Sequence, residues 1–186
     1  MKFCSSCGRP IERRVPEGDD RERYVCPACD IVHYQNPKVV VGSVCFWQER
    51  VLLCRRAIEP RKGFWTIPAG YLEIGESTEA GALREAWEEA HARLELEGLL
   101  AVYSVPRIGQ VQVLYRGQLL SPDVAAGPES AEVGLFAWAD IPWPELAFPT
   151  VHWILGRAGE LFGRPPPFET VGNPEEQPPP LGSGGL

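Results

Sequence analysis

Four cysteines arranged as two C-x2-C pairs constrain the first part of this chain more than any other feature. The pairs are Cys4 with Cys7 and Cys26 with Cys29, and 18 residues separate them. Together they supply the four sulfur ligands that structural Zn²⁺ prefers. Two disulfides are the alternative, but the amino terminus has no apolar signal segment, so we expect a reducing compartment and zinc.

The composition divides the chain into three parts. Residues 1–36 are polar and too few to build a large apolar core, so zinc would supply much of the folding free energy of this predicted zinc ribbon. Residues 37–164 carry the apolar runs of a folded domain, including Cys45 and Cys54, which we expect to be buried thiols. Residues 165–186 hold seven prolines and four glycines, which predicts a disordered tail.

Periodicity in the central part predicts a mixed α and β domain. Two β-branched runs joined by a short polar turn predict a hairpin, and two stretches with apolar residues at helical spacing predict helices. The expected strands are 38–47, 50–56, 65–67, 96–105, 111–120 and 133–139, the expected helices are 78–94 and 149–161, and a turn is expected at 68–70.

The charge balance limits the ligands of the chain. It has 25 acidic and 18 basic side chains, a formal net charge of −7. This argues against binding the phosphate backbone of nucleic acid, which depends on an excess of Lys and Arg. An anionic ligand would therefore need a metal ion or local arginines. No apolar run approaches the roughly 20 residues of a membrane span, so we expect a cytoplasmic protein without membrane contacts.

The predicted helix over 78–94 has two chemically different faces. Five apolar residues recur at spacings of three and four, which predicts that they are buried. Three glutamates cluster on the opposite side, where their repulsion is offset if a hard cation such as Mg²⁺ or Mn²⁺ lies among them. A solvated acidic face is the alternative. The apolar residues are Ala80, Leu83, Trp87, Ala90 and Leu94, and the acids are Glu85, Glu88 and Glu89.

The residues around this helix follow a longer pattern. Gly70 is followed by five residues and Glu76, and then by seven residues and the run Arg84-Glu85-Ala86-Trp87-Glu88-Glu89. This string resembles the signature of the Nudix hydrolases, which fixes Gly, Glu, Arg-Glu and Glu-Glu at these positions. The signature then expects Gly where this chain has His91, a departure that concerns the end of the helix more than the acidic cluster.

The resemblance implies an α+β Nudix fold, a mixed β-sheet sandwiched between helices, that hydrolyses a pyrophosphate bond. By the family pattern Glu85, Glu88 and Glu89 are the catalytic acids. Glu85 and Glu89 would ligate Mg²⁺ or Mn²⁺ with the carbonyl of Ala69 close by, and Glu88 would be a further ligand or the base.

Three more residues receive roles from the same pattern. Glu76 and Arg84 would be structural and joined by a charge-assisted hydrogen bond. A distant acid completes the metal site in similar enzymes, and its spacing to Leu135-Phe136 favours Glu129 over Glu132. An ordinary surface glutamate is the alternative for Glu129.

Stretches outside the signature resemble one subgroup that carries an amino-terminal zinc ribbon. They are residues 34–38, 65–73, 108–110, 127–130 and 146–148, which are similar to the group of the plant chloroplast FAD pyrophosphatase, also active on ADP-ribose. The implied reaction is the release of AMP from FAD, ADP-ribose or both. The alternatives are an NADH or capped-RNA pyrophosphatase and a non-catalytic Nudix module that senses a nucleotide.

A dinucleotide substrate offers flat rings and a charged diphosphate. Trp65 and Tyr71 could stack on a ring, while Arg107 and Gln110 could reach phosphate or polar ring atoms. Each could instead be a packing residue, and a core role is the main alternative for Trp65. Many related hydrolases form dimers, so by analogy a homodimer is among the expected partners.

Overall fold

The structure is a computed structural model that describes residues 1–161 and 163–164. The tail predicted to be disordered, residues 165–186, lies outside the described residues. The chain forms two compact units, residues 1–37 and the part from residue 38 onward. Each unit contains its own β-sheet.

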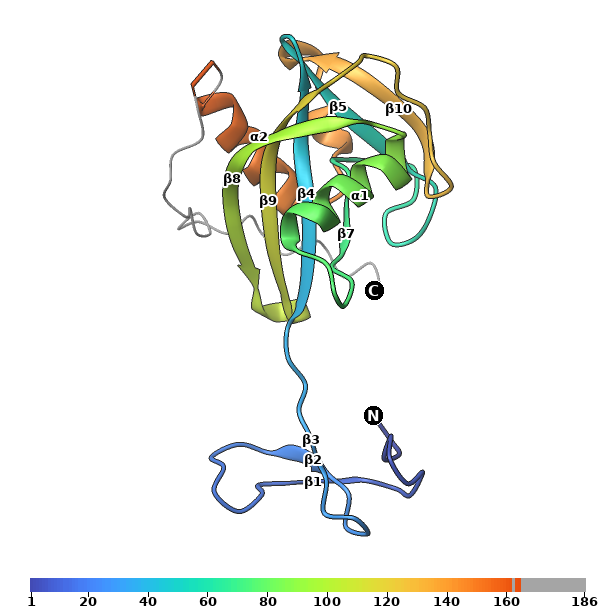
Figure 1. Ribbon diagram of the computed structural model, residues 1–186, viewed down its shortest axis with the longest axis vertical. Helices are drawn as coiled ribbons and strands as arrows, with labels where there is room; N and C mark the ends of the chain where they lie inside the picture. The colour runs from blue at the N-terminus through green and yellow to red at the C-terminus, as the bar shows by residue number, and fades with distance from the viewer. Residues whose placement is uncertain (162, 165–186) are drawn as a thin grey trace. The chain divides into compact units, whose positions relative to one another are not determined.

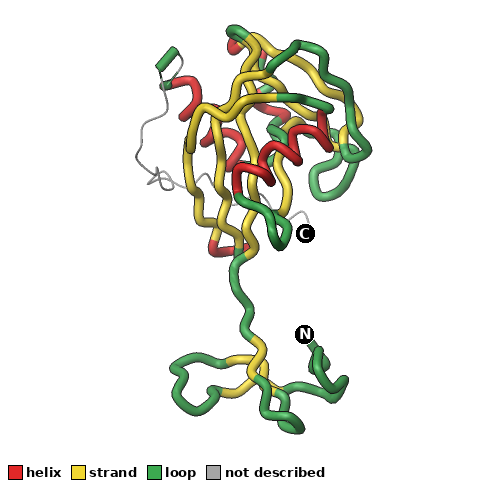
Figure 2. Tube along the Cα trace, in the orientation of Figure 1, coloured by secondary structure: helices red, strands yellow, loops and turns green. Residues whose placement is uncertain are grey.

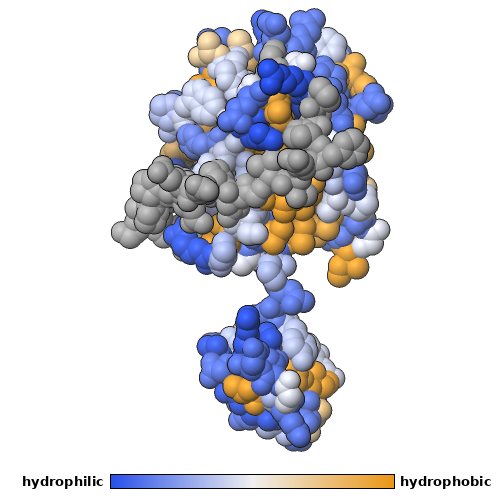
Figure 3. Space-filling model, turned by 90° about the vertical axis from the view of Figure 1, so that its left-hand side faces the viewer, coloured by the Kyte–Doolittle hydropathy of each residue, from blue (hydrophilic) through white to orange (hydrophobic). Residues whose placement is uncertain are grey.

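The first unit is a small antiparallel sheet with almost no apolar core. Its strands are β1 (Glu12–Arg14), β2 (Arg23–Val25) and β3 (Val32–His33), in the order β1-β2-β3. Loops make up most of the unit (Figure 2), and its surface is largely hydrophilic (Figure 3). The buried apolar side chains are those of Cys4, Val25 and Cys26. Because so little apolar surface is buried, the cysteines must contribute to holding the unit together.

The second unit is built on a seven-stranded mixed sheet. The main path runs β10-β5-β4-β9-β8, with β6 beside β5 and β7 beside β4. Among the strand pairs of the described residues, the pairing of β4 with β9 is the parallel one, and the predicted hairpin of β4 and β5 is confirmed. The strands are β4 (Lys38–Trp47), β5 (Arg50–Arg56), β6 (Trp65–Thr66), β7 (Ala69–Tyr71), β8 (Leu94–Val105), β9 (Gln110–Leu119) and β10 (Ser130–Ala137).

Two helices cover the two faces of this sheet. Helix α1 (Thr78–Ala90) crosses in front of β4 and β9 in Figure 1, and α2 (Pro149–Glu160) lies behind the sheet. The core is divided accordingly, with one apolar cluster around α2 and another around α1. Three short 3-10 turns cover Pro106–Ile108, Trp138–Asp140 and Trp143–Glu145. The predicted α+β architecture, a mixed sheet between helices, is confirmed.

The predicted buried face of α1 is correct at Ala90 and wrong at Ala80, Leu83 and Trp87. Leu83 and Trp87 remain 38% and 45% exposed, and Ala80 is also exposed. The side chains turned to the sheet are mostly the smallest ones, namely Gly81, Ala82, Ala86 and Ala90, together with Glu85 and Glu89. Small residues allow a closer approach of the helix to β4 than Leu or Trp would. The acids thereby lie at the edge of a buried face instead of opposite it.

The bounds of two elements also differ from the sequence prediction. The predicted turn at residues 68–70 is largely strand β7, because its backbone pairs with β4. Helix α1 ends at Ala90, and Leu94 is buried as the first residue of β8. The helix does not continue past Ala90 because the next residue, His91, adopts a left-handed conformation, with φ 46°. Glycine adopts that conformation most easily, which accounts for the Gly of the signature at this position.

No helix in the described part of the chain is both long and apolar enough to cross a membrane. Cys45 and Cys54 are 0% and 1% exposed, as expected for buried thiols.

Candidate active site and zinc site

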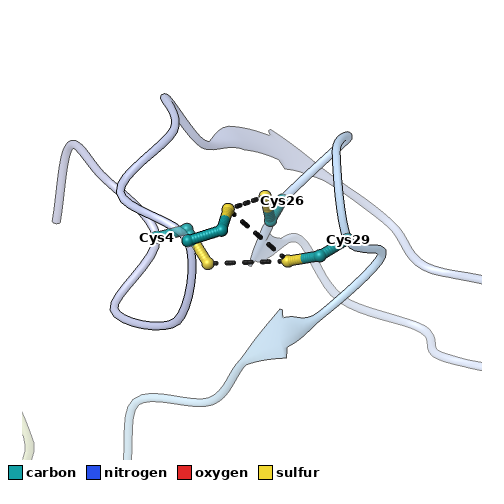
Figure 4. Close-up of side chains that lie close together, drawn as sticks. Cys4, Cys26 and Cys29 are labelled. Carbon is teal, nitrogen blue, oxygen red and sulfur yellow. Dashed lines mark hydrogen bonds between the residues drawn. The ribbon is translucent and has the colours of Figure 1, made fainter.

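The side chains of Cys4, Cys26 and Cys29 in the first unit point toward one another (Figure 4), and Cys7 belongs to the same cluster. All four Sγ atoms lie within 4.8 Å of one another. The Sγ distances are 3.7 Å for Cys4–Cys29, 3.5 Å for Cys7–Cys26 and 3.7 Å for Cys7–Cys29. A tetrahedral zinc ion with bonds of about 2.3 Å would hold its sulfur ligands about 3.8 Å apart. None of these cysteines forms a disulfide, so the donor set and its spacing fit structural zinc.

The imidazole of His33 supports this cluster from outside. Its Nε2 atom lies 3.3 Å from the Sγ atom of Cys4. A hydrogen bond to a ligating sulfur orients the ligand without replacing it.

In the second unit, close packing brings α1 against β7. Ser77 caps the helix, since its hydroxyl oxygen accepts a hydrogen bond from a backbone N–H of the first turn. A Cβ atom at Gly70 would collide with the carboxylate of Glu85, so glycine there leaves this carboxylate its place against the strand. The backbone N–H of Ala69 donates to Oε2 of Glu89 at 3.3 Å. Two carboxylates of the helix are therefore held beside the backbone of β7.

Arg84 links four parts of this site. Its Nε and Nη2 atoms donate to the two carboxylate oxygens of Glu76 at 3.0 and 2.7 Å. Nη1 donates to Glu85 and Glu88 at 2.7 and 2.8 Å, and Nη2 also donates to the carbonyl of Tyr71 at 3.0 Å. Hydrogen bonds from Arg84 lower the pKa of Glu76 to about 2. The arginine thus fixes the loop before α1 to the helix and to β7.

The loop before β10 is docked on the carboxyl end of α1. The N–H groups of Ala125 and Gly127 donate to the carbonyls of Ala90 and Glu89 at 2.9 and 3.0 Å. A Cβ atom at Gly127 would collide with the carbonyl oxygen of Glu88, so only glycine permits this approach. The docking fixes the residues that follow close to the acidic edge of the helix.

Glu129 and Glu132 consequently have different surroundings. Glu129 acts electrostatically on the buried acids of α1, as described below. Glu132 lies within β10 and forms an exposed ion pair with Arg55 at 3.4 Å. Of the two candidates, Glu129 is the one beside the acidic cluster.

The surroundings of the two buried glutamates, Glu85 and Glu89, disfavour the ionised form of their carboxyl groups. Burial is the main cause that raises the pKa of Glu89 to about 8, and the charges of Glu85 and Glu129 add to it. Burial also raises the pKa of Glu85, against the hydrogen bond from Arg84 and with support from Glu88 and Glu129. A divalent cation would relieve this repulsion and restore the ionised forms.

The acidic cluster differs from the cysteine cluster in one respect. Among the described residues, only the four cysteines place three or more ligating side-chain atoms of His, Cys, Asp or Glu within 4.8 Å of one another. The carboxylates of Glu85 and Glu88 instead bind Nη1 of Arg84. The oxygen donors fit Mg²⁺ or Mn²⁺ by their chemistry, and they would have to rotate toward a shared ion.

The predicted substrate contacts are spread over the unit. Tyr71 is 48% exposed, and its hydroxyl accepts a hydrogen bond from Nε2 of Gln110 at 3.3 Å, so these two lie together. Arg107 is exposed in the 3-10 turn between β8 and β9. Trp65 is only 6% exposed and packs edge-on against Phe136 at 4.9 Å between ring centroids. The structure therefore gives Trp65 a core role in place of the stacking role.

One basic residue near this site, Arg56, was not predicted from the sequence. The charge of Arg56, at the end of β5, lowers the pKa of Glu89 against the larger effect of burial. Strand alternation is the signal that could have found it, because Leu52 and Cys54 on the same strand both pack in the α1 cluster.

Comparison with known families identifies both units. A model described as "Nudix N-terminal", for a zinc ribbon, matches residues 2–35, and a model described as "NUDIX domain" matches residues 36–154. The chain belongs to the Nudix family. The expectation of a Nudix pyrophosphohydrolase with an amino-terminal zinc ribbon is confirmed.

Known Nudix proteins resemble the chain to different extents. An ADP-ribose pyrophosphatase of Methanocaldococcus jannaschii is 29% identical over 62% of this chain and 69% of that protein. The NAD-capped RNA hydrolase NudC of Stutzerimonas stutzeri is 30% identical over 70% of this chain, but the match spans 46% of NudC. The plant FAD group is not among these findings, so the assignment to that subgroup stays a prediction.

A solved structure matches nearly the whole Nudix chain. The crystal structure of a NUDIX hydrolase from Nitrosomonas europaea is 48% identical and covers 93% of this chain and 100% of its own, with a TM-score of 0.86.

Proposed function

We propose that this chain is a Mg²⁺- or Mn²⁺-dependent pyrophosphohydrolase that cleaves the diphosphate of ADP-ribose, FAD or both and releases AMP. The observation that carries the proposal is the convergence of four acids. Glu85, Glu88 and Glu89 lie on α1 and Glu129 on the docked loop, and the carboxylates of Glu85 and Glu89 are buried against β7. A chain without a cationic ligand gains nothing from burying acids that repel one another.

The proposed roles follow the burial of the side chains: the buried acids would bind the cation, and the exposed acid would accept a proton. Glu85 and Glu89, with the backbone carbonyl of Ala69, would hold the cation, and Glu129 would complete its ligands. When bound there, a divalent cation polarises phosphoryl oxygens and acidifies a water molecule. Glu88, whose side chain is 55% exposed, is placed to accept the proton of the attacking water.

Arg84 and Glu76 position this machinery. The bidentate pair fixes the guanidinium, which in turn holds Glu85 and Glu88 near the site before a cation arrives. Their role is structural, since the pair spans the loop from β7 to α1 and leaves the reacting atoms to the other acids.

ADP-ribose is the first substrate to test. The relative from M. jannaschii is an ADP-ribose pyrophosphatase, and FAD shares the adenosine diphosphate half of ADP-ribose. The subgroup resemblance of residues 34–38, 65–73 and 146–148 supports both. Tyr71 at the end of β7 and Gln110 at the start of β9, whose side chains are hydrogen-bonded, are the proposed contacts of the ring or ribose.

One activity panel tests this function. Purified protein would be incubated with ADP-ribose, FAD, NADH and an NAD-capped RNA, each with Mg²⁺, with Mn²⁺ and without metal. Release of AMP would be measured for the dinucleotides, and formation of 5′-monophosphate RNA for the capped RNA. We expect turnover of ADP-ribose or FAD that requires the cation. Thermal stabilisation by these nucleotides without hydrolysis would instead identify a sensor module. Glu129→Gln should lower turnover, whereas the matched variant Glu132→Gln should leave it within about twofold of the wild type.

NAD-capped RNA is the second candidate, because NudC matches 70% of this chain. The charges of the ribbon oppose it. Four of its arginines are paired with neighbouring acids: Arg13 with Glu22, Arg14 with Glu12 and Asp30, Arg21 with Asp20, and Arg23 with Asp19. Phosphate binding would have to replace these pairs. A salt-dependent RNA titration decides this point, since a phosphate-binding ribbon gives a steep loss of affinity with salt.

A further inference from the structure

The cysteine cluster of the first unit concentrates negative charge in a small sheet. Four thiolates around one Zn²⁺ leave an excess of negative charge on the sulfur atoms. Four arginines of this unit are already paired with carboxylates. Hydrogen bonds from N–H groups close to the sulfur atoms are another way to offset this charge.

Cys4 receives such hydrogen bonds from two directions. The backbone N–H of Ser6, in the turn that leads to Cys7, donates to Sγ of Cys4 at 3.4 Å. Nε2 of His33 lies 3.3 Å from the same sulfur, although His33 is 29 residues further along the chain. Because Cys4 is only 3% exposed, water competes little for its sulfur atom.

His33 lies beside the cysteine cluster and not within it. The Sγ atoms of the four cysteines all lie within 4.8 Å of one another, and the imidazole of His33 is not part of this group. Four sulfur atoms already complete the tetrahedral ligand set that structural zinc prefers. The geometry therefore suits a hydrogen-bond donor to one ligand, and it does not suit a fifth ligand.

The strand pairing of the first unit fixes the position of His33. His33 is the last residue of β3 and pairs with Tyr24 of β2. Its neighbour Val32 pairs with Val25, whose side chain is fully buried. The hydrogen bond to Cys4 thus joins the end of β3 to the first C-x2-C turn.

We propose that His33 is a positioning residue of the zinc site, whose Nε2–H group donates a hydrogen bond to the thiolate of Cys4 and thereby helps the first unit to retain zinc. A zinc-bound thiolate has no proton, so the sulfur accepts and the imidazole nitrogen donates. The bond stabilises the ionised sulfur, which is the form of cysteine that binds zinc. The proposal concerns the first unit and is independent of the reaction of the second unit.

Three substitutions of His33 separate the hydrogen bond from the packing of the ring. Glutamine carries an amide N–H at about the position of Nε2, asparagine carries it nearer the position of Nδ1, and leucine has no donor. His33→Gln should keep the contact with Cys4, whereas His33→Asn and His33→Leu should lose it. Tyr34→Leu changes the next residue, which is 61% exposed, and is the matched control.

The first measurement is the zinc affinity of the full-length protein, determined by competition with a chelator at constant pH. For His33→Asn and His33→Leu we expect the affinity to fall about 10- to 100-fold, the range for loss of a hydrogen bond to a metal ligand. His33→Gln should recover most of the affinity, and Tyr34→Leu should stay within about twofold of the wild type. Amide hydrogen exchange in residues 1–37 confirms that each zinc-loaded variant is folded.

The second measurement is the absorption spectrum of the cobalt-substituted protein. The charge-transfer band from sulfur to cobalt reports the electron density on the thiolates, which a purely structural role of His33 would not change. The band should move to longer wavelength in His33→Asn and His33→Leu, because a sulfur without its hydrogen bond gives up an electron more easily. It should stay in place in His33→Gln and Tyr34→Leu.

Four results would overturn the proposal. Wild-type zinc affinity and an unmoved cobalt band in His33→Asn and His33→Leu would show that His33 does not help to hold the metal. Equal losses in His33→Gln and His33→Leu would assign the effect to packing of the ring. A cobalt spectrum that loses a nitrogen ligand in His33→Leu would make His33 a ligand itself. If His33→Leu does not fold with excess zinc, His33→Gln and His33→Asn decide, and equal affinities of these two overturn the proposal.

Discussion

The two units each carry a cluster of metal-ligating side chains, and the clusters differ in what they do for the fold. In the first unit the strands are two or three residues long, and two of the four clustered cysteines are themselves part of the small buried interior. In the second unit two apolar clusters cover both faces of a sheet, and Glu85 and Glu89 lie against β7.

In the first unit, zinc would contribute to folding itself. In the second unit, the fold forms without a cation and holds the proposed cation ligands in place. The sulfur atoms already lie near the spacing of a closed tetrahedral site, so the ribbon gains folding free energy from zinc. The carboxylates of the second unit are held close together by packing that exists without a cation, and their repulsion is a cost to the apo fold. Open, oxygen-lined sites of this kind suit substrate chemistry.

Removing a zinc ligand should have the largest effect, and it should be confined to the first unit. Structural zinc is worth about 10 kcal/mol or more to small domains, so Cys26→Ser should unfold residues 1–37. Zinc content by mass spectrometry and amide hydrogen exchange in each unit would measure this. Cys45→Ala, a buried cysteine of the second unit, should keep the zinc. If the amide hydrogens of residues 1–37 stay protected from exchange in Cys26→Ser, the first unit does not depend on zinc for folding.

Removing the proposed base should abolish chemistry and spare the fold. Glu88 is exposed and contributes little to packing, so Glu88→Gln should lower the turnover of ADP-ribose by about 10²- to 10⁴-fold with almost the same melting temperature. Glu79→Gln, an exposed acid on the first turn of the same helix, should retain activity within about twofold. Equal activity of the two variants would exclude Glu88 from the reaction.

The stability of the magnesium-free protein should fall as pH rises. Because the pKa of Glu89 is raised from 4.5 to about 8 by burial, the folded state binds this proton more tightly than the unfolded chain. Its stabilising effect is fully present below about pH 4.5 and is lost as pH rises through about 8.

The checking measurement is the melting temperature between pH 5 and 8.5, with zinc retained and magnesium removed. Glu89→Gln should flatten the decline, and Mg²⁺ should raise the melting temperature more at pH 8 than at pH 5. A wild-type curve parallel to that of Glu89→Gln would show that Glu89 titrates normally.

The smallest expected effect concerns the end of α1. His91 has φ 46° where the signature has Gly, and its Nδ1 atom lies 3.2 Å from the carbonyl oxygen of Ala125. His91→Gly removes the backbone strain together with the side chain, while His91→Ala removes only the side chain. The glycine variant should therefore be more stable than the alanine variant by about 1 kcal/mol. Equal denaturation midpoints would mean that this position stores no strain.

Local patterns in the sequence were sufficient for several features. Cysteine spacing predicted the sulfur cluster, and the β-branched runs predicted the hairpin of β4 and β5, because both depend on residues that are near one another along the chain. The signature predicted the loop and helix of the acidic site. The position of Glu129 beside that helix was a prediction from family spacing, and the docking of Gly127 gives it a physical basis.

What failed was the orientation of α1. Periodicity favoured burial of Leu83 and Trp87, but the helix packs through Gly81, Ala82 and Ala86. Hydrophobicity alone does not report how closely a helix must approach its sheet, and here the close approach of β7 at Gly70 decides the buried face.

The sequence by itself determined which reactive side chains each unit carries, namely sulfur ligands in one and a run of acids in the other. It also determined strands and helices near their observed positions. Only the tertiary structure decided which acids are buried, that Trp65 belongs to the core, and that Arg56 lies beside Glu89 although they are 33 residues apart in the chain. The physical reason is that pKa values, burial and ion pairing depend on neighbours brought together across strands. A sequence pattern reports only on contacts between residues of the same helix or strand, and it does not show which residues of other elements lie nearby.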